Sequence, residues 1–420
     1  MALNPWKGLE GLPRDLWLIC GAVLINRTGT MALPFLVLYL TGSEGFSVGE
    51  AGFTVTLYGL GSLVTAPVAG ALCDRIGSLR VMRASLLLSG ALMILIPMVH
   101  GKLAIMAATL VLAMTAEGAR PASMALVTEA APAGRHKAAF AVHRLAINLG
   151  MSVGPATGGL LASVSFPLIF YVDGATSIAA GLVLTSVRLP AVEAARAAAV
   201  ARQAERRGSR LRDELHAFTD RRLMFFLAAL LPALIVFFQH QAAMPLYLVG
   251  ELGMSEATYG LLFTVNTVLI ILLEVPLNLA MSSWPHRRAL PLGALLTGAG
   301  FGAMGLVTGF PMVALTVVVW TFGEMILLPG ASAWVAESAP AHRLGAYMGL
   351  FVMSFSVAFA IGPWLGATVY DRYGGGALWG MAFLCGCLSA ALMTMISEPP
   401  TPGVPRRELA DEQVPTNLAD

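Results

Sequence analysis

The chain repeats itself at a fixed distance. The segment Arg120–Arg135 (RPASMALVTEAAPAGR) returns 208 residues later as Leu328–Arg343 (LPGASAWVAESAPAHR), and eight of the sixteen positions are identical. The same offset pairs further residues: Tyr39 with Tyr247, Gly52 with Gly260, and Gly154-Pro155 with Gly362-Pro363. A repeat of this length predicts two homologous halves that fold alike.

The composition places both halves in lipid. Hydrophobic residues make up 57% of the 420, charged residues only 12%, and mean hydropathy is +0.76, whereas soluble domains carry about 25% charged residues. A helix needs about 20 apolar residues to cross a bilayer. We expect twelve such spans, at 16–40, 52–73, 81–100, 104–130, 138–163, 166–187, 223–249, 257–281, 289–309, 312–338, 345–370 and 377–396. The sequence thus predicts an all-α membrane protein with 12 transmembrane helices in two six-helix bundles.

The distribution of Lys and Arg predicts the orientation. Of the 26 basic residues, four fall within the predicted spans, two fall on one side of the membrane and 20 on the other. By the positive-inside rule the basic side is cytoplasmic. Arg80 and its repeat equivalent Arg288 lie on the same side, so each half has an even number of spans and the halves are parallel. We therefore predict a multi-pass protein of the cytoplasmic (inner) membrane with both termini in the cytoplasm.

Four regions are expected along the chain. They are an N-terminal six-helix bundle at 1–187, a cytoplasmic linker at 188–222, a C-terminal six-helix bundle at 223–396 and a disordered cytoplasmic tail at 397–420. The linker holds nine arginines and five acids, and the tail opens with a Pro-rich run, which cannot bury enough apolar surface to fold. The first apolar stretch lacks a small-residue cleavage site and is expected to remain as the first helix.

Several chemistries lack the residues that they require. The sequence has no G-x-x-x-x-G-K-[ST] phosphate loop, no G-x-S-x-G nucleophile motif and no zinc-ligand spacing. Its four cysteines follow no disulfide or metal pattern. The basic residues are segregated by membrane side rather than pooled into a nucleic-acid surface. We expect no enzyme activity, no metal, no cofactor and no nucleic-acid partner.

A short motif joins the second and third predicted spans. It reads GALCDRIG over residues 70–77 and is followed by Arg80. Here the chain resembles the major facilitator superfamily, whose loop signature is G-x-L-x-D-R-x-G followed by basic residues. The resemblance implies that fold, and it implies a latch that holds the outward-facing state, formed by Gly70, Asp74, Arg75, Gly77 and Arg80.

Elementary chemistry fits the latch. Gly70 permits close helix contact, Gly77 permits a tight turn, and the Asp74 carboxylate can accept hydrogen bonds from a helix N-terminus. The alternative is a basic loop that only sets topology. The second half has Ser282 and Ser283 at the positions equivalent to Asp74 and Arg75. The latch is therefore expected in the first half of the chain only.

Glycine recurs at every fourth residue of the fifth predicted span. The residues are Gly150, Gly154 and Gly158, with Pro155 inside the run and Gly159 beside it. Small residues at this spacing bring helix backbones together in lipid. The segment also resembles the signature associated with the drug/proton antiporter branch of the superfamily. Helix packing alone is an equal alternative, and both explanations can hold.

Six ionisable residues near the middle of predicted spans are candidates for function, because each costs at least about 2.5 kcal/mol there unless paired or hydrated. They are Arg27, Glu117, Arg120, Arg144, Glu274 and Glu324. We expect them to line a cavity between the halves. Glu117 and Arg120 are three residues apart on one helix face, so a structural ion pair is an equal alternative for these two.

Glu324 is the first candidate for proton coupling, and Glu274 is the second. Glu324 lies near the middle of the tenth span with no basic residue in its own helix, and a carboxylate removed from water there can load and release a proton. The resemblance to drug/proton antiporters, several of which use an acid in helix 10, supports this choice. Both acids belong to the second half and the arginines to the first, so the charges could exchange partners as the halves move. Each acid could instead form a fixed ion pair.

Uncharged polar residues and histidines complete the predicted substrate cavity. They are Asn26, His143, Asn148, Gln239, His240, Gln241 and Tyr247. Asn148 is one turn from Arg144 and is expected to share its face. A lone membrane histidine is more often a hydrogen-bonded packing residue than a proton carrier, although its titration range would suit transport.

Together these features predict a secondary transporter that works by alternating access. The leading hypothesis is proton-coupled efflux of lipophilic or amphipathic small molecules by a monomer in the lipid bilayer. The main alternative is a proton-coupled or facilitative importer of a nutrient. A non-transporting membrane sensor or a lipid scramblase is a weaker alternative, because an inert scaffold has no evident need for six intramembrane charges.

Overall fold

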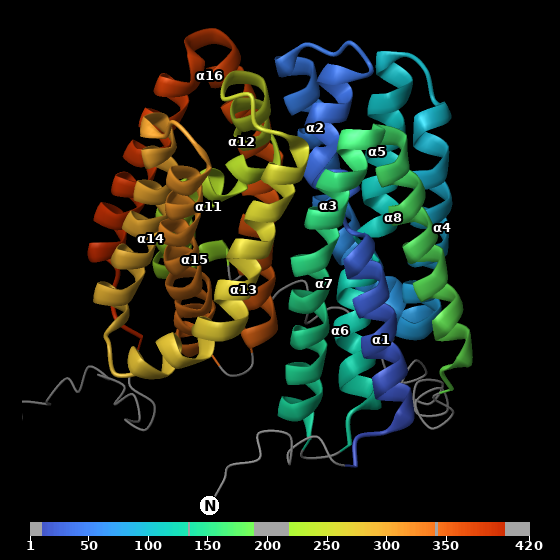
Figure 1. Cartoon of the computed structure of the whole chain (residues 1–420). Coiled ribbons are helices and arrows are strands. Elements are labelled where there is room, and N and C mark those ends of the chain that lie inside the picture. The colour runs from blue at the N-terminus through green and yellow to red at the C-terminus, as the bar shows by residue number, and fades with distance from the viewer. Residues whose placement is uncertain (1–10, 133–134, 189–217, 341–342, 400–420) are drawn as a thin grey trace, which may run out of the picture.

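The protein is described by a computed structural model over residues 11–132, 135–188, 218–340 and 343–399. All regular secondary structure in these residues is helical. Figure 1 shows two bundles side by side, the first half of the chain in blue to green and the second in yellow-green to red. The predicted fold class is confirmed. Most of the predicted linker (189–217) and of the predicted tail (400–420) lies outside the described residues.

The first bundle provides six spans from eight helices. Two spans are interrupted, because α1 and α2 together form one and α5 and α6 form another. The helices are α1 (Arg14–Gly29), α2 (Ala32–Gly42), α3 (Val48–Ile76), α4 (Ser78–Leu95), α5 (Lys102–Ala116), α6 (Ala119–Ala130), α7 (His136–Val164) and α8 (Phe166–Val183), with short 3₁₀ turns η2 (Ile96–Met98) and η3 (Leu184–Ser186).

The second bundle repeats this arrangement. Its seventh span starts as α11 (Arg221–Phe237) and continues through η4 (Phe238–Gln241), α12 (Ala243–Pro245) and a π-helical turn η5 (Leu246–Glu251). The other helices are α13 (Glu256–Ala280), α14 (His286–Gly302) with η6 (Ala303–Leu306), α15 (Phe310–Ser338) and α16 (Leu344–Thr394).

The apolar helices account for the twelve predicted spans. Ten helical segments are long and apolar enough to cross a membrane, and α3 is an eleventh that bends by 41° between Thr65 and Pro67. α16 is 51 residues long and contains two helices that meet at Gly374, whose φ of 80° breaks the helix. A proline inside α3 removes a backbone hydrogen bond, which explains the bend there.

The two ends of the bundles differ in charge. We call one end the basic face; it carries the helix ends near Arg75, Arg80, Arg135, Arg222 and Arg287. The turn of α16 lies at the other end, at the top of Figure 1, which we call the opposite face. The positive-inside rule predicts that the basic face is cytoplasmic.

Two helix pairs, which we call seams, join the bundles: α7 with α13, and α3 with α16. In the α7/α13 seam a Cβ on Gly260 would lie 2.3 Å from the Pro155 carbonyl oxygen, and a Cβ on Gly159 would lie 2.4 Å from the Glu256 carbonyl oxygen. No side chain fits at these distances, so backbone meets backbone. Gly260 and Glu256 belong to the first turns of α13, and the contact therefore lies toward the opposite face.

The α3/α16 seam is packed in the same way by the repeat equivalents. A Cβ on Gly52 would lie 3.2 Å from the Pro363 carbonyl oxygen and 2.5 Å from the Ala367 Cβ. The Tyr259 hydroxyl adds a contact between the halves: it donates to the His240 carbonyl at 2.7 Å and lies 3.3 Å from the Pro34 carbonyl oxygen of the other half. Both seams are thus closed near the opposite face.

The glycine ladder of α7 serves contacts within its own bundle. A Cβ on Gly150 would lie 2.3 Å from the Arg27 Cβ, and one on Gly154 would lie 2.8 Å from the Arg27 carbonyl oxygen. A Cβ on Gly158 would meet the Met31 side chain at 2.6 Å. The ladder therefore seats α1 against α7, and the neighbouring Pro155 and Gly159 contact the other half. Packing is one function of this motif.

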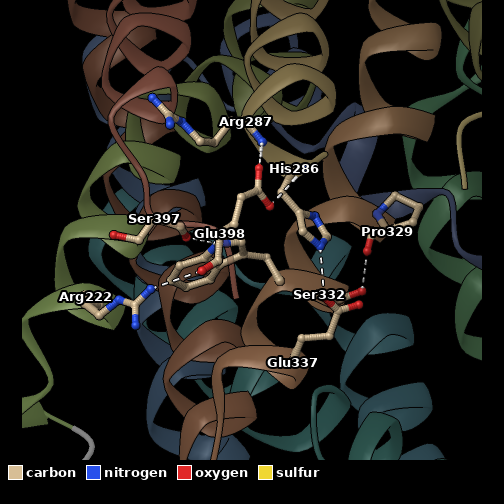
Figure 2. A network of polar contacts seen from close by, with 9 residues as sticks. Arg222, His286, Arg287, Pro329, Ser332, Glu337, Ser397 and Glu398 are labelled. Carbon is tan, nitrogen blue, oxygen red and sulfur yellow. Dashed lines mark hydrogen bonds and ion pairs between the residues drawn. The ribbon is translucent and has the colours of Figure 1, made fainter. Parts of the chain in front are cut away.

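The beginning of the predicted tail is ordered against the second bundle. The Glu398 carboxylate accepts hydrogen bonds from the first backbone amides of α14, at His286 (3.3 Å) and Arg287 (2.8 Å). The Arg222 guanidinium donates to the Glu398 carbonyl at 3.1 Å, and His286 Nε2 lies 3.1 Å from a Glu337 carboxylate oxygen. Figure 2 shows these contacts on the basic face. Glu398 thereby caps α14, whose first amides lack partners within the helix.

Candidate functional site

A cavity of about 310 Å³ lies between the two bundles. α7 contributes Arg144 and Asn148 to its wall, and the rest comes from α13 and α15: Ile270, Glu274, Glu324, Met325, Leu328, Pro329 and Ser332. Arg144 is eight residues from the start of α7, which is about 12 Å at 1.5 Å per residue. The cavity therefore lies in the part of the protein nearer the basic face, beyond the point where the seams close.

An ion pair crosses this cavity from one half to the other. The Arg144 guanidinium of α7 donates to the Glu274 carboxylate of α13. The Arg144 side chain is 61% exposed and that of Glu274 is 10% exposed, so the arginine reaches from the open cavity toward a carboxylate set in the wall. It therefore links the two halves of the chain. A movement that separates α7 from α13 must break it.

Glu324 faces the same cavity from α15. One carboxylate oxygen accepts a hydrogen bond from the Asn266 amide of α13 at 2.9 Å, and the same amide nitrogen lies 3.0 Å from the Thr321 hydroxyl. α15 is apolar along nearly its whole length, and Gly323 packs against the backbone of α14 near Thr297. This packing fixes the rotation of α15 and directs Glu324 toward α13 and the cavity.

The remaining wall is mainly apolar. Ile270 comes from α13, and Met325, Leu328 and Pro329 come from α15, while Ser332 donates its hydroxyl to the Pro329 carbonyl within the same helix. Four of the nine lining residues are thus apolar and five are polar or charged, which makes this cavity more polar than most sites for small organic molecules. The volume is at the lower end of the range of such sites, about 300 to 1,000 Å³.

A second polar group lies inside the first bundle. The Tyr58 hydroxyl donates to the Glu117 carboxylate at 3.1 Å, and Glu117 and Asp173 both act electrostatically on the partly buried Arg27. Glu117 lies at the break between α5 and α6, and no ion pair joins it to Arg120 in the described part of the chain. The structural ion pair considered for these two residues is therefore absent in this conformation.

Asp173 was missed in the sequence. It is 4% exposed, and one of its oxygens accepts hydrogen bonds from the Met31 amide at 3.3 Å and the Ala32 amide at 3.1 Å, where α1 gives way to α2. The carboxylate thus caps a helix N-terminus, where negative charge is favoured. An acid inside the apolar span 166–187 was the available signal. Asn266 was also missed, because one amide in an apolar helix stands out less than a charge.

The other predicted cavity residues of the first bundle do not line this cavity. Asn26 donates its amide to the Ser177 hydroxyl at 3.0 Å within the bundle. Arg120 is exposed on α6. His143 is 3% exposed, and its Nε2 has no hydrogen-bond partner among the described residues. Contact of these side chains with substrate remains a prediction for other conformations.

The predicted residues of the seventh span lie at a helix break beyond the cavity. Gln239 is fully buried and donates to the Ile235 and Gly362 carbonyls at 2.8 and 3.0 Å. His240 Nδ1 lies 2.6 Å from the Phe237 carbonyl oxygen, and its Nε2 lies 2.8 Å from the Gln241 amide. Tyr247 packs between aromatic rings near the opposite face. These groups satisfy the backbone of the broken helix, as polar side chains must in lipid.

The predicted latch lies at the basic face. Gly77 ends α3 with a φ of 105°, a conformation that glycine adopts readily, and the sharp turn into α4 follows. Asp74 and Arg75 are exposed, and Arg80 donates to the Ile76 carbonyl at 3.5 Å. A Cβ on Gly70 would meet no atom within 4 Å, so the close helix contact expected there is absent in this conformation. No group of three or more metal-binding side chains occurs among the described residues.

Comparisons with known proteins agree with the architecture. The sequence model of the Major Facilitator Superfamily matches residues 18–249 and 240–419. The chain is 23% identical over 386 residues to YqjV of Bacillus subtilis, an uncharacterized MFS-type transporter, which covers 89% of this chain and 90% of that protein. It is 23% identical over 374 residues to a Na⁺, Li⁺, K⁺/H⁺ antiporter of Planococcus maritimus, covering 82% and 87%.

A shorter match is to the quinolone resistance protein NorA of Staphylococcus aureus, 26% identical over 150 residues, covering 36% of this chain and 38% of NorA. Solved structures with the same fold include a D-xylose–proton symporter, with a TM-score of 0.72, 15% identity and coverage of 92% of this chain and 97% of that one. A nucleoside transporter, NupG, gives a TM-score of 0.74 at 13% identity, covering 90% and 97%. At these identities the structures establish the fold alone.

Proposed function

The chain belongs to the major facilitator superfamily, and we propose that it is a proton-coupled exporter of lipophilic or amphipathic small molecules. The observation that carries this proposal is the Glu324 carboxylate, which faces a cavity with polar and apolar lining that also contains the inter-half ion pair Arg144–Glu274. A titratable acid, a substrate-sized space and a contact broken by rocking are the three parts that a coupled carrier requires.

The parts support the following cycle. In the present conformation the seams are closed near the opposite face and the cavity lies toward the basic face. A substrate enters the cavity from the basic face as Glu324 releases a proton there. Opening toward the opposite face parts the Gly260–Pro155 and Gly52–Pro363 contacts, and the movement of α7 against α13 rearranges the Arg144–Glu274 pair. A proton returning to Glu324 from that side weakens substrate binding and resets the protein.

The size of the cavity supports an organic substrate over a bare ion. About 310 Å³ exceeds the space that a single alkali ion needs, and four of the nine lining side chains are apolar. The name of NorA ties one distant relative to quinolone resistance, and the name of the Planococcus protein ties another to exchange of alkali cations for protons. Both are consistent with antiport, and they differ in substrate.

Import of a nutrient is the second candidate. The D-xylose–proton symporter has the same fold, and a symporter would use the same acid and cavity with the opposite direction of coupling. The two functions differ in what an imposed gradient does. Efflux by antiport moves substrate against the flow of protons, whereas symport moves both together.

The test uses purified protein in liposomes with an internal pH dye and a panel of lipophilic dyes that includes ethidium. We expect a proton gradient to drive dye uptake opposite to the proton flow. Glu324→Gln should abolish this uphill flux while downhill dye exchange stays measurable, because the amide keeps the volume but cannot titrate. Glu337→Gln, on the same helix outside the cavity, is the matched control and should transport normally. Wild-type uphill flux in Glu324→Gln would show that another group couples the proton, with Glu274 next in order.

A further inference from the structure

Two polar side chains that the proposed cycle does not use lie directly against Glu324. Asn266 belongs to α13 and is 9% exposed, and Thr321 belongs to α15 and is fully buried. The Asn266 amide nitrogen lies 2.9 Å from a Glu324 carboxylate oxygen and 3.0 Å from the Thr321 hydroxyl oxygen. The three groups form a short chain across the contact between α13 and α15.

The orientation of the Asn266 amide follows from its partners. The Thr321 hydroxyl lies 2.6 Å from the Val317 carbonyl oxygen and donates its single proton there. Toward Asn266 the same hydroxyl can only accept, so Asn266 must present its NH₂ group to it. An NH₂ group carries two protons, and the second points to Glu324. The amide is thus held with its nitrogen toward the carboxyl group.

This orientation distinguishes the two protonation states of Glu324. A carboxylate accepts the Asn266 N–H, and a hydrogen bond to the charged form favours that form. A protonated carboxyl would instead need an acceptor for its own O–H. If Asn266 turned its carbonyl oxygen around to provide one, that oxygen would face the lone pairs of Thr321, whose proton is already committed to Val317.

We propose that Asn266, oriented by Thr321, is a positioning residue that stabilises the ionised Glu324 and so sets the pH range in which the carrier turns over. This inference rests on the proposed role of Glu324 in proton coupling. The link also has a mechanical side. Asn266 lies two turns before Glu274 on α13. Protonation of Glu324 therefore changes a hydrogen bond to the helix that carries the inter-half ion pair.

Few other charges face Glu324. Glu274 of α13 and Arg144 of α7 share its cavity. α14 packs on another side of α15 with Thr297, and its ionisable residues His286, Arg287 and Arg288 lie in its first turn at the basic face. His240 of the seventh span stacks on Trp320, one turn before Glu324. Asn266 is therefore the one described side chain that donates a hydrogen bond to the Glu324 carboxylate.

The experiment titrates Glu324 directly in the full-length purified protein, without any substrate. Infrared difference spectra report the protonated carboxyl band, which is assigned to Glu324 by its loss in Glu324→Gln. We expect Asn266→Leu, which keeps the volume and removes the donor, to move the midpoint of this band by about one pH unit toward alkaline pH, a tenfold change in proton binding. Thr321→Val, which only frees the orientation of the amide, should move it in the same direction by less.

Asn278→Leu is the matched control. Asn278 lies on the same helix and its amide donates to the backbone carbonyls of Glu274 and Met325, at 2.8 and 3.2 Å. It therefore ties α13 to α15 as Asn266 does but does not touch the Glu324 carboxylate, and its loss should leave the titration unchanged. A wild-type midpoint in both Asn266→Leu and Thr321→Val would overturn the inference. Uphill flux that survives Glu324→Gln would instead refute the coupling role of Glu324, and absence of proton-driven dye flux in the wild type would refute the proposed function, so these failures are told apart.

Discussion

The two seams between the bundles are built alike at one end and differently at the other. Near the opposite face, Gly260 of α13 meets the Pro155 carbonyl, and its repeat equivalent Gly52 of α3 meets the Pro363 carbonyl. Near the basic face the symmetry ends. α7/α13 carries the Arg144–Glu274 pair, whereas the equivalent positions of α3/α16 hold Ala66 and Val352.

The difference shows what duplication supplied and what changed afterwards. Backbone packing at glycine depends on both halves keeping the same shape, so it was retained in both seams. Charge in the membrane is costly and persists where it has a use, and at this pair of equivalent positions the α7/α13 seam is charged whereas the α3/α16 seam is not. The α3/α16 seam has a different polar device, the predicted latch at Asp74, which the second half lacks. We infer that the polar contacts of the α7/α13 seam change with occupancy and protonation of the cavity. Those of the α3/α16 seam change as the basic face opens or closes.

The largest effect is expected from breaking what the seams share. Gly52→Val and Gly260→Val each place atoms where the opposing backbone lies, and overpacking of this kind costs about 1 to 3 kcal/mol. The closed opposite face should lose population by roughly 5- to 150-fold, about equally in the two variants. A cysteine at Leu262, which is 2% exposed, should then react with an impermeant maleimide from that face.

Gly349→Val is the control for this pair, because a Cβ there would meet no atom within 4 Å. It should leave the labelling at the level of the parent protein. Unchanged labelling in both Gly52→Val and Gly260→Val would show that the two seams do not seal the opposite face.

The next effect separates the seams. Arg144→Lys keeps the charge of the α7/α13 pair but loses the planar fork of the guanidinium, so we expect transport to fall by about tenfold, the equivalent of one charge-assisted hydrogen bond of about 1.5 kcal/mol. Arg14→Lys is the matched control from the same half, because Arg14 is exposed at the start of α1 and does not line the cavity. Initial rates in proteoliposomes decide the matter. Normal affinity and coupling in Arg144→Lys would refute the assignment of Arg144 to the working cavity.

A smaller effect is expected at the other seam. Asp74→Asn removes the charge of the predicted latch, and a carboxylate at a helix N-terminus contributes about 0.3 to 1 kcal/mol. The outward-facing state should lose population by roughly two- to fivefold. A cysteine at Ser332 in the cavity wall should therefore react faster from the basic face, and flux should slow. Unchanged labelling together with unchanged flux would favour a loop that only sets topology.

The sequence was sufficient for the architecture because lipid imposes simple requirements. Span lengths, the repeat and the bias of basic residues follow from bilayer thickness and charge, and the fold agrees. Four predicted cavity residues, Arg144, Asn148, Glu274 and Glu324, meet in one cavity. They lie on the fifth, eighth and tenth spans. Comparison of the repeats predicts this difference, because the arginine belongs to the first half and both acids belong to the second.

Other predicted cavity residues lie at helix breaks, and the pattern of apolar residues in the sequence does not reveal where a helix breaks. Gln239 and His240 have the polarity of cavity residues, but their side chains bond to main-chain carbonyls around the break in the seventh span. Asp173 does the same for the first span. A polar residue in an apolar helix can serve a cavity or an interrupted backbone, and composition is the same in both cases. Only the position of the break separates them.

The smallest effect concerns the basic face, where the halves also differ. Asp220 starts α11, and it accepts hydrogen bonds from the Tyr347 hydroxyl of α16 and from the Arg222 and Leu223 amides. The equivalents of Asp220 and Tyr347 in the first half are Leu12 and Ala139. Partial burial opposes ionisation of Asp220, but these hydrogen bonds and the charge of Arg222 outweigh it and hold the pKa of Asp220 below its usual value.

A lowered pKa in the folded state adds stability above the pKa of the unfolded chain, about 3.9 for Asp, and this stability is lost as the pH falls through the folded value. We therefore expect the α11–α16 contact to weaken below about pH 4 while the first bundle does not weaken at the equivalent contact. Hydrogen exchange of the first amides of α11, compared between wild type and Asp220→Asn at each pH, measures this. The wild type should be better protected at pH 6, and the difference should vanish toward pH 3. Equal protection at pH 6 would show that the Asp220 charge does not hold the two helices together.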